Sequence, residues 1–441
     1  MPFYPALKCG LFSGRAVFGR ACLIRLVYCE RWHDRLPARR EQYAALEFPP
    51  ALVFHRCMKL LPLVVPACAA LCALAFSHTR AEAAGSGFFV YFGTYTGEKS
   101  KGIYVSRFDT ATGRLTVPEL AAESNSPSFL AVHPTGRFLY AVNEAGDGKE
   151  RGVSAFAVDA QSGRLAALGE RPSGGSGPCH LAVDRAGRCV IVANYVGGSV
   201  ESLPIGEDGK LGEPVSFIQH KGSGVDPERQ KGPHAHCAAI DAGNRFAFVC
   251  DLGLDRVLIY KLAATTGSLV PNEPPAGLVK PGSGPRHIAF HPNGKFAYVI
   301  NEMGGSVTVF AFDAARGALE EVESLSTLPP DFSGRKSCAE IAVHPSGKFV
   351  YASNRGHDSI AVFAADERTG RLTPVMHAPT GGKEPRNFAI DPTGAFLFTA
   401  NQNSDSIVIF RIDAKTGRLE PTGQSIGVGK PVCVVFVPMK G

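Results

Sequence analysis

The stretch HPSGKFVYASNR, residues 344–355, decides the fold, because the chain contains six copies of its pattern at intervals of about fifty residues. Each copy is a tight turn, His/Asp-Pro-x-Gly-Lys/Arg in its fullest form, followed by a run of strand-forming residues. The copies begin at His133, Asp184, Asp241, His291, His344 and Asp391. Eleven residues after these starts stand Glu144, Tyr195, Leu252, Glu302, Arg355 and Gln402. The fixed offset predicts that the strand after the turn has the same length in every unit.

A second turn, Asp-x-x-Thr-Gly-Arg-Leu in its fullest form, recurs seven times. Its glycines are Gly113, Gly163, Gly209, Gly267, Gly317, Gly370 and Gly417. Glycine suits such a turn because it adopts the positive φ that other residues avoid. Each unit also holds four strand-like runs, for example residues 129–132, 138–142, 153–158 and 165–170. Four strands in about fifty residues are typical of a propeller blade.

The seventh unit is split between the two ends of the repeat region. Residues 434–438 supply its first strand and residues 89–92 its second. Pairing these segments would close the ring and leave no open edge between the first and last blades. The sequence therefore predicts an all-β fold, a seven-bladed β-propeller with four antiparallel strands per blade, closed by its N- and C-terminal strands.

Composition agrees with strands and turns. The 441 residues include 49 Gly and 32 Pro, and only 20% are charged, which excludes a coiled coil and disfavours a mostly helical protein. The formal net charge of +6 resides in residues 1–84, while the remaining chain carries 35 residues of each sign. A neutral body without a basic patch argues against a nucleic-acid partner.

The first 83 residues do not share the repeat. Residues 58–83 have the pattern of a secretory signal peptide: Met58-Lys59, an apolar run to Phe76, and Ala81-Glu82-Ala83 as cleavage site. Residues 1–57 are then a leader that is either disordered or the product of a misassigned start, and we favour Met58 as the true start. The propeller domain is assigned to residues 84–441. We expect a periplasmic or secreted monomer, free of the membrane after cleavage, or a cytoplasmic one if the signal is not used.

Six cysteines lie in the body of the chain, most of them inside apolar runs: Cys179, Cys189, Cys237, Cys250, Cys338 and Cys433. None shows a Cys-x-x-Cys spacing. Export permits disulfides, but we expect buried thiols.

Two rings of residues are predicted at one end of the channel, because the start of the first strand in a blade lies beside the end of the second. Five residues before each turn start stand Ser128, Cys179, His236, Arg286, Ala339 and Arg386, with Val432 from the split blade. The second ring is the set eleven residues after each start, with Tyr95 from the split blade. These rings gather one His, three Arg and two Glu, a mixture suited to acid–base chemistry on an anion. The alternative is that the charges solvate the mouth of the channel.

Other chemistry is less well supported. His234 and His236 lie on one face of a strand and resemble a metal pair, but a third ligand is not evident and zinc usually takes three or four. No Gly-x-Ser-x-Gly elbow is present, so a serine-nucleophile hydrolase is not expected. We predict neither a metal nor a cofactor.

The chain resembles the lactonase family of seven-bladed propellers, which includes a 6-phosphogluconolactonase and the carboxy-cis,cis-muconate cyclising enzyme. The likeness covers residues 87–438, and its most specific parts are the motifs at residues 225–236, 284–287, 299–302, 353–360 and 384–386. The resemblance implies hydrolysis of a sugar lactone. It also implies a site made of His236, Arg286 and Glu302, with Arg355 and Arg386 as further arginines.

Residue types suggest roles within that chemistry. His236 is a candidate base, Arg286 a candidate clamp for the oxyanion, and Glu302 a group that orients Arg286 or relays a proton. His234, Arg355, Arg386 and Glu144 are candidate substrate-binding residues, and the motif leaves open which histidine acts as base. The phosphorylated or unphosphorylated state of the lactone also stays open. Alternatives are an exported propeller that only binds a ligand or protein, and a lactone-forming cyclase of the muconate type.

Overall fold

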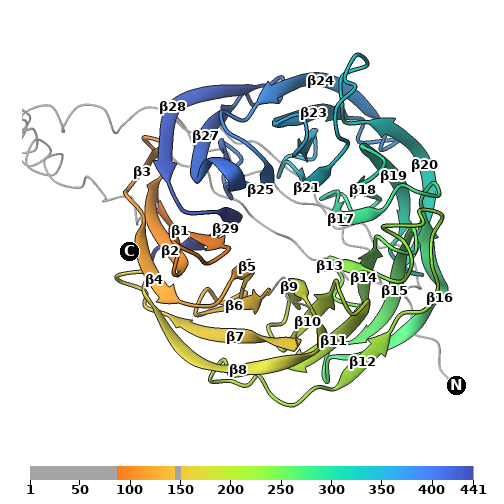
Figure 1. The fold of residues 1–441 in the computed structure, drawn as a ribbon, viewed down its shortest axis with the longest axis horizontal. Coiled ribbons are helices and arrows are strands. Elements are labelled where there is room, and N and C mark those ends of the chain that lie inside the picture. Colours follow the sequence, from red (N-terminus) through yellow and green to blue (C-terminus); the bar gives the residue numbers. More distant parts are fainter. Residues whose placement is uncertain (1–86, 145–149, 441) are drawn as a thin grey trace, which may run out of the picture. The chain divides into compact units, whose positions relative to one another are not determined.

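A computed structural model describes residues 87–144 and 150–440, and these residues form seven β-sheets arranged as a ring (Figure 1). Blades 1 to 6 are the sheets β5–β8, β9–β12, β13–β16, β17–β20, β21–β24 and β25–β28. Every pairing within a blade is antiparallel, so the predicted propeller is confirmed. The leader at residues 1–57 and the signal peptide at residues 58–83 lie outside the described residues.

Strand lengths repeat from blade to blade. The innermost strands are β5 Pro127–Val132, β9 Pro178–Val183, β13 Ala235–Ile240, β17 Pro285–Phe290, β21 Cys338–Val343, β25 Pro385–Ile390 and β29 Pro431–Pro438. The second strands are β6 Phe138–Asn143, β10 Cys189–Asn194, β14 Phe246–Asp251, β18 Phe296–Asn301, β22 Phe349–Asn354, β26 Phe396–Asn401 and β1 Gly87–Thr94. In blades 1 to 6 each second strand has six residues, as the fixed offset predicted.

The outer half of each blade varies more. The third strands are β7 Glu150–Val158, β11 Ser199–Pro204, β15 Arg256–Ala263, β19 Ser306–Asp313, β23 Ser359–Ala365, β27 Ser406–Ile412 and β2 Gly102–Asp109. The outermost are β8 Leu165–Ser176, β12 Ser216–Gln219, β16 Ser268–Leu278, β20 Ala318–Ser326, β24 Leu372–Pro379, β28 Leu419–Gly427, and in blade 7 the short β3 Arg114–Leu115 and β4 Glu119–Glu123. A 3₁₀ turn, η1, covers Gln402–Ser404. Among the described residues no helix is long and apolar enough to cross a membrane.

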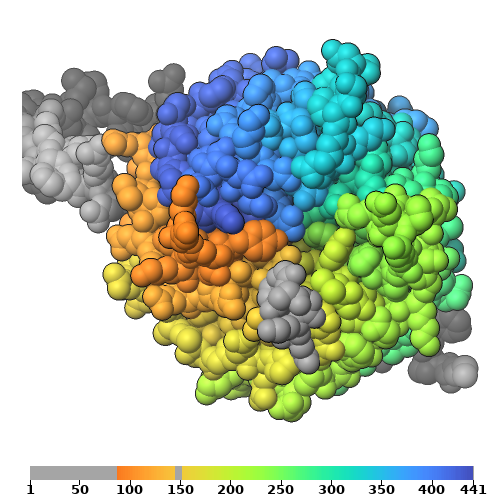
Figure 2. Space-filling view, viewed as in Figure 1, coloured from red at the N-terminus to blue at the C-terminus, as the bar shows by residue number. Residues whose placement is uncertain are grey.

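Blade 7 closes the ring with strands from both ends of the repeat region. The innermost strand β29 pairs antiparallel with β1, from Phe88 opposite Pro438 to Thr94 opposite Pro431. Figure 2 shows the consequence on the surface, where orange N-terminal strands lie against the dark blue C-terminal one. The predicted split blade is therefore confirmed.

Adjacent blades are held together by apolar layers. Seven clusters of buried residues occur in the described chain, each joining the facing sides of two neighbouring blades. All six cysteines of the body are buried and unpaired, as predicted, and they fill these layers or the channel wall.

The two repeated turns lock neighbouring blades to each other. Gly370 has φ +72°, and an added Cβ would lie within 3.0 Å of the Phe296 ring in the preceding blade. The Tyr298 hydroxyl donates a hydrogen bond to the Gly370 carbonyl at 3.2 Å. Equivalent contacts join Gly163 to Phe89, Gly209 to Phe138, Gly317 to Phe246, Gly417 to Phe349 and Gly113 to Phe396. The markers recur in every unit because one marker packs on the other across each blade boundary.

Candidate active site at the channel mouth

A β-bulge near the start of each innermost strand points one side chain into the mouth of the channel. In blade 4, for example, Pro285 pairs with Asn301 and His287 with Ile300, so Arg286 is the extra residue. The corresponding extra residues are Ser128, Cys179, His236, Arg386 and Val432, with Ala339 and Glu340 at this place in blade 5. Bulges re-aim side chains in this way beside many active sites.

The second predicted ring is attached to the first by one repeated hydrogen bond. The backbone N–H of Glu302 donates to the carbonyl of Gly284, two residues before Arg286, at 2.8 Å. The same bond fixes Glu144, Tyr195, Leu252, Arg355, Gln402 and Tyr95 in the other blades. Both rings therefore lie at one end of the channel.

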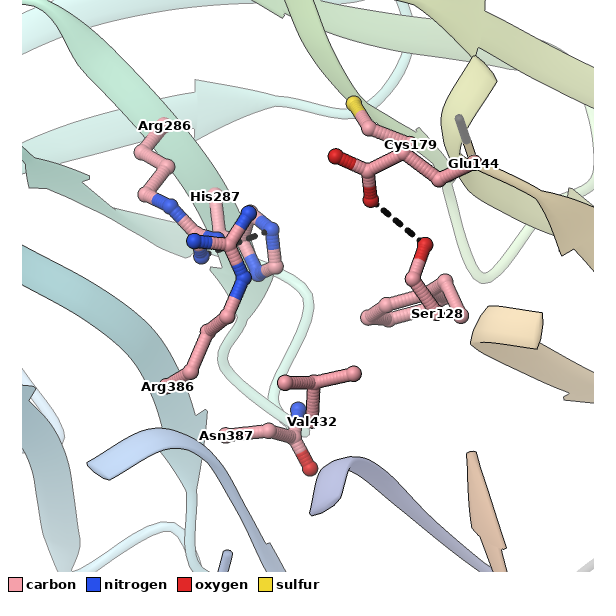
Figure 3. Close-up of a pocket in the computed structure, with 9 residues that line it drawn as sticks. Ser128, Glu144, Cys179, Arg286, His287, Arg386, Asn387 and Val432 are labelled. Atoms are coloured by element: carbon pink, nitrogen blue, oxygen red, sulfur yellow. Dashed lines mark hydrogen bonds between the residues drawn. The ribbon is translucent and has the colours of Figure 1, made fainter. Parts of the chain in front are cut away.

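A small pocket opens at this end and is lined mainly by the bulged residues and their neighbours (Figure 3). Arg286 and Arg386 reach into it from one side, and Glu144 and Ser128 face them from the other. The carboxylate of Glu144 accepts hydrogen bonds from Ser128 Oγ at 2.5 Å and from Tyr95 Oη at 2.9 Å. The pocket thus has a cationic wall and an acidic wall.

Glu302 is the centre of a buried ion cluster. Its Oε2 lies 2.7 Å from Arg355 Nη2 and 3.2 Å from Arg286 Nε, and its Oε1 accepts from Arg229 Nη2 at 2.9 Å. The side chains of Arg286, Arg355 and Glu302 are 3%, 7% and 10% exposed. Burial opposes ionisation of Glu302, but the charges of Arg355 and Arg286 outweigh it and lower its pKa to about 2.

The arginines of this cluster outnumber their counter-ion. Burial, together with the nearby charge of Arg386, lowers the pKa of Arg286, and burial lowers the pKa of Arg355 to about 10. Both guanidinium groups are treated as charged, because guanidinium groups in proteins are not deprotonated at neutral pH. Three cations around one carboxylate leave a positive excess, and two of them, Arg286 and Arg355, are buried, which favours an anionic ligand or a developing oxyanion.

Arg386 makes the fewest polar contacts of the arginines at the site. Its guanidinium lies 5.5 Å above the centre of the Tyr95 ring, and within the described part of the chain it forms no hydrogen bond or ion pair. Although burial disfavours its charge, Tyr95 and Glu144 raise the pKa of Arg386 above its usual value. Its donors are therefore free for a ligand.

His236 lies next to these arginines and is buried. Its ring is 5.2 Å from that of His287 and 5.3 Å from that of Tyr195. Burial and the charge of Arg286 lower the pKa of His236 well below its usual value, so the imidazole is neutral at pH 7. Its Nδ1 is buried without a hydrogen-bond partner among residues 87–144 and 150–440.

His234 is held differently from His236. Its Nδ1 is 2.9 Å from the backbone carbonyl of Tyr195, and its ring stacks on the Tyr195 ring at 4.7 Å. These contacts fix His234 beside Tyr195 at the rim, and neither His234 nor His236 is among the residues that line the pocket. In the part of the chain that the structure describes, no cluster of three or more metal-ligating side chains is present.

Two features of the site were not predicted. Arg229, which binds Glu302 and donates to Tyr195 Oη at 3.1 Å, comes from the long segment between β12 and β13. It stands within the motif at residues 225–236, which was the available clue. The second feature is a layer beneath the mouth, made of His180, His287, Glu340 and Asn387, each one residue beyond a first-ring position or its equivalent.

Fold and site together define a class of protein: a seven-bladed β-propeller whose channel mouth presents a neutral histidine beside an excess of buried arginines. Family comparison gives the particular group. The description "Lactonase, 7-bladed beta-propeller" matches residues 89–436, and the chain belongs to this family.

Known members support this assignment. The 6-phosphogluconolactonase of Bacillus subtilis is 39% identical over 297 residues, which cover 67% of this chain and 83% of the relative. The 6-phosphogluconolactonase of Formosa agariphila is 36% identical over 302 residues, covering 68% and 85%. Among solved structures, the periplasmic gluconolactonase of Pseudomonas aeruginosa has a TM-score of 0.76 and 35% identity, with 80% of this chain and all of that chain covered.

Proposed function

We propose that this protein hydrolyses a six-carbon sugar lactone to the open-chain sugar acid. The observation that carries the proposal is the surplus of buried guanidinium groups beside a neutral imidazole at the channel mouth. The relatives named 6-phosphogluconolactonase and gluconolactonase act, by their names, on this class of ester.

In the proposed reaction His236 removes a proton from water while the water oxygen attacks the lactone carbonyl. Nε2 is the nitrogen assigned to this step, because Nδ1 is enclosed by protein. Arg286 and Arg386 stabilise the oxyanion of the tetrahedral intermediate. The ring C–O bond then breaks, and the protonated His236 returns its proton to the departing oxygen. Water is consumed and no cofactor is required.

Glu302 is assigned an orienting role rather than a proton relay. A carboxyl group with a pKa of about 2 holds no proton at neutral pH and cannot supply one to the leaving group. Its bonds to three arginines instead keep Arg286 and Arg355 at the mouth. Glu144 and the rim residue His234 are assigned to binding the hydroxyl groups of the sugar.

The preferred substrate follows from the expected location. The signal-peptide pattern at residues 58–83 predicts export, whereas phosphorylated sugars are found mainly inside the cytoplasm. We therefore assign glucono-δ-lactone as the better substrate and its 6-phosphate as the poorer one.

Acid release by the purified protein from both lactones, with spontaneous hydrolysis subtracted, tests the proposal. We expect turnover of both with a higher kcat/KM for glucono-δ-lactone. Turnover of the phosphate ester alone would refute the substrate assignment. Binding of gluconate without hydrolysis of either lactone would refute catalysis and favour a binding protein. Closure of a lactone from a muconate-type acid would favour the cyclase.

A further inference from the structure

A chain of hydrogen bonds runs from Arg286 into the channel beneath the site. Arg286 Nη1 donates to His287 Nε2 at 3.1 Å and to the Ala339 carbonyl at 2.6 Å, and His287 Nδ1 donates to Glu340 Oε1 at 2.9 Å. Because Nε2 accepts from a guanidinium, His287 must be neutral with its proton on Nδ1. Glu340 is the group that fixes this tautomer.

Glu340 is buried and accepts every bond that reaches it. Its Oε1 also accepts from the backbone N–H of Ile341 at 3.0 Å, and its Oε2 accepts from Asn387 Nδ2 at 2.5 Å. The Asn387 Oδ1 in turn accepts from the Val434 N–H at 2.9 Å. Flipping the Asn387 side-chain amide would therefore lose the hydrogen bonds to both Glu340 and Val434. Three donors reach the two oxygens, which favours an ionised carboxylate. Protonation of Glu340 would weaken these hydrogen bonds, because a neutral carboxyl group is a poorer acceptor than a carboxylate.

We propose that Glu340 is a positioning residue that, through His287, holds the guanidinium of Arg286 in its reactive orientation and thereby makes lactone hydrolysis depend on the ionisation of a carboxyl group in the channel. The inference rests on the proposed function, since the orientation of Arg286 matters only if Arg286 meets the substrate. Glu340 itself does not touch the substrate in this account.

The surroundings of Glu340 allow its titration near neutral pH. Burial raises the pKa of Glu340 to about 7, and Arg286, the Ile341 N–H, His180 and Asn387 oppose that rise. Strand β17 contributes Arg286 and His287, β9 His180, β25 Asn387 and β29 Cys433, while the neighbouring β22 contributes the neutral Ser353. The neighbouring strand β18 contributes Ile300 and the buried Tyr298, and burial raises the pKa of Tyr298, so its hydroxyl is uncharged. Above about pH 7 the carboxylate is ionised and the chain is intact; below it the chain loosens.

The test compares wild type with Glu340→Gln over pH 5.5 to 8.5, using kcat/KM for glucono-δ-lactone. The amide mimics the protonated state, so we expect kcat/KM about tenfold below wild type at pH 8.5 and a ratio approaching one at pH 5.5. Glu323→Gln, the same change on the outer strand β20, should follow the wild-type profile. A ratio that stays constant with pH, or that stays at one, would overturn the proposal.

Two further measurements separate this inference from the proposed function and from misfolding. If Glu340 acts through His287, then adding Glu340→Gln to a His287→Phe variant should lower kcat/KM by less than a further twofold. A further tenfold loss would contradict the hydrogen-bond path from Glu340 through His287 to Arg286.

Thermal unfolding needs no substrate. The Tm of Glu340→Gln relative to wild type should rise between pH 5 and 7, because the raised pKa makes the wild-type carboxyl progressively unfavourable to folding. A pH-independent Tm difference overturns the titration even if no lactone is hydrolysed.

Discussion

Glu302 is the residue whose replacement separates electrostatic from packing effects at the site. In Glu302→Gln the guanidinium groups of Arg286, Arg355 and Arg229 lose their counter-ion, so we expect a loss of 3–5 kcal/mol in the free energy of unfolding, about the cost of breaking a buried pair. Urea denaturation at pH 7 measures this change. Glu323→Gln is the control: Glu323 pairs with the more exposed Arg371 and is itself 22% exposed, and the amide oxygen can still accept from the Leu372 N–H, so the cost should be only about 1 kcal/mol.

The difference in the free energy of unfolding between wild type and Glu302→Gln should depend on pH. The pKa of Glu302 is lowered from 4.5 to about 2 on folding, so its contribution to stability is present above about pH 4.5 and is lost as the pH falls towards 2. The shift corresponds to about 3 kcal/mol at neutral pH. The stability difference between wild type and Glu302→Gln should therefore narrow below pH 4.5. A difference that stays constant would contradict an ionised Glu302 in the cluster.

His236 and His234 stand two residues apart but make different contacts, so His234→Ala is a suitable comparison for His236→Ala. We expect His236→Ala to lower kcat for lactone hydrolysis about 10²-fold, as loss of a general base does. His234→Ala should have a milder effect, since its ring is fixed to Tyr195 at the rim. Steady-state kinetics with both variants decides which histidine acts, and a larger loss for His234→Ala would reverse the assignment.

At the scale of residues, the sequence predicted which side chains lie together at the channel mouth, but not the contacts among them. Spacing from the repeated turn placed Arg286 and Glu302 on the same face, and the hydrogen bond that joins the two rings in every blade explains why the spacing was sufficient. Arg229 could not be placed, because its segment lies outside the repeat and its contact with Glu302 crosses from one blade to another.

At the scale of elements, the β-bulges are the feature that spacing alone does not show. The extra residue of the bulge is Arg286 in β17 and Arg386 in β25, and the bulge directs each side chain towards the channel mouth. Because the second strands all have six residues, the residues that follow them lie at the same height, beside the bulged residues. Nothing in the local composition distinguishes Glu340, one residue beyond Ala339, from an ordinary strand residue. Its role depends on His287 and Asn387 from the two adjacent blades.

The repeated turns supply a test of how the blades interlock. Gly370 and Gly294 both have positive φ. A Cβ added at Gly370 would meet the Phe296 ring, whereas a Cβ added at Gly294 would have no atom within 4 Å apart from its immediate chain neighbours. Gly294→Ala should cost about 1–2 kcal/mol from backbone strain alone. Gly370→Ala should cost at least 1 kcal/mol more, because the blade boundary must also open. Equal losses in chemical denaturation would show that the turn does not lock the blades.

At the scale of the whole molecule, the strand β29 closes the ring. It buries Val432, Cys433, Val434 and Val437 against blades 6, 7 and 1. Deleting residues 431–441 removes about four buried apolar side chains, worth roughly 1.5–3 kcal/mol each, which approaches the whole net stability of a domain. We expect insoluble protein, judged by the soluble fraction after expression. A soluble truncation with a cooperative unfolding transition would contradict closure by this strand.

The ring was predictable as a whole because each blade repeats two markers, and the two markers touch across every boundary. The assignment of residues 1–57 and 58–83 rests on the sequence alone. If Met58 is the true start, the exported protein should begin near Ala84, and N-terminal sequencing of the mature protein checks this. Peptides from residues 1–57 in the mature protein would contradict it.

The central claim is that lactone hydrolysis takes place at the arginine-lined mouth of the channel, and kcat/KM of Arg286→Ala with glucono-δ-lactone tests it most directly. Arg137→Ala is the matched control, because Arg137 is an exposed arginine in a turn at the opposite end of blade 1. We predict a loss of at least 10²-fold for Arg286→Ala, partial recovery in Arg286→Lys, and wild-type activity for Arg137→Ala. Undiminished hydrolysis by a folded Arg286→Ala protein would place the reaction elsewhere and contradict the account.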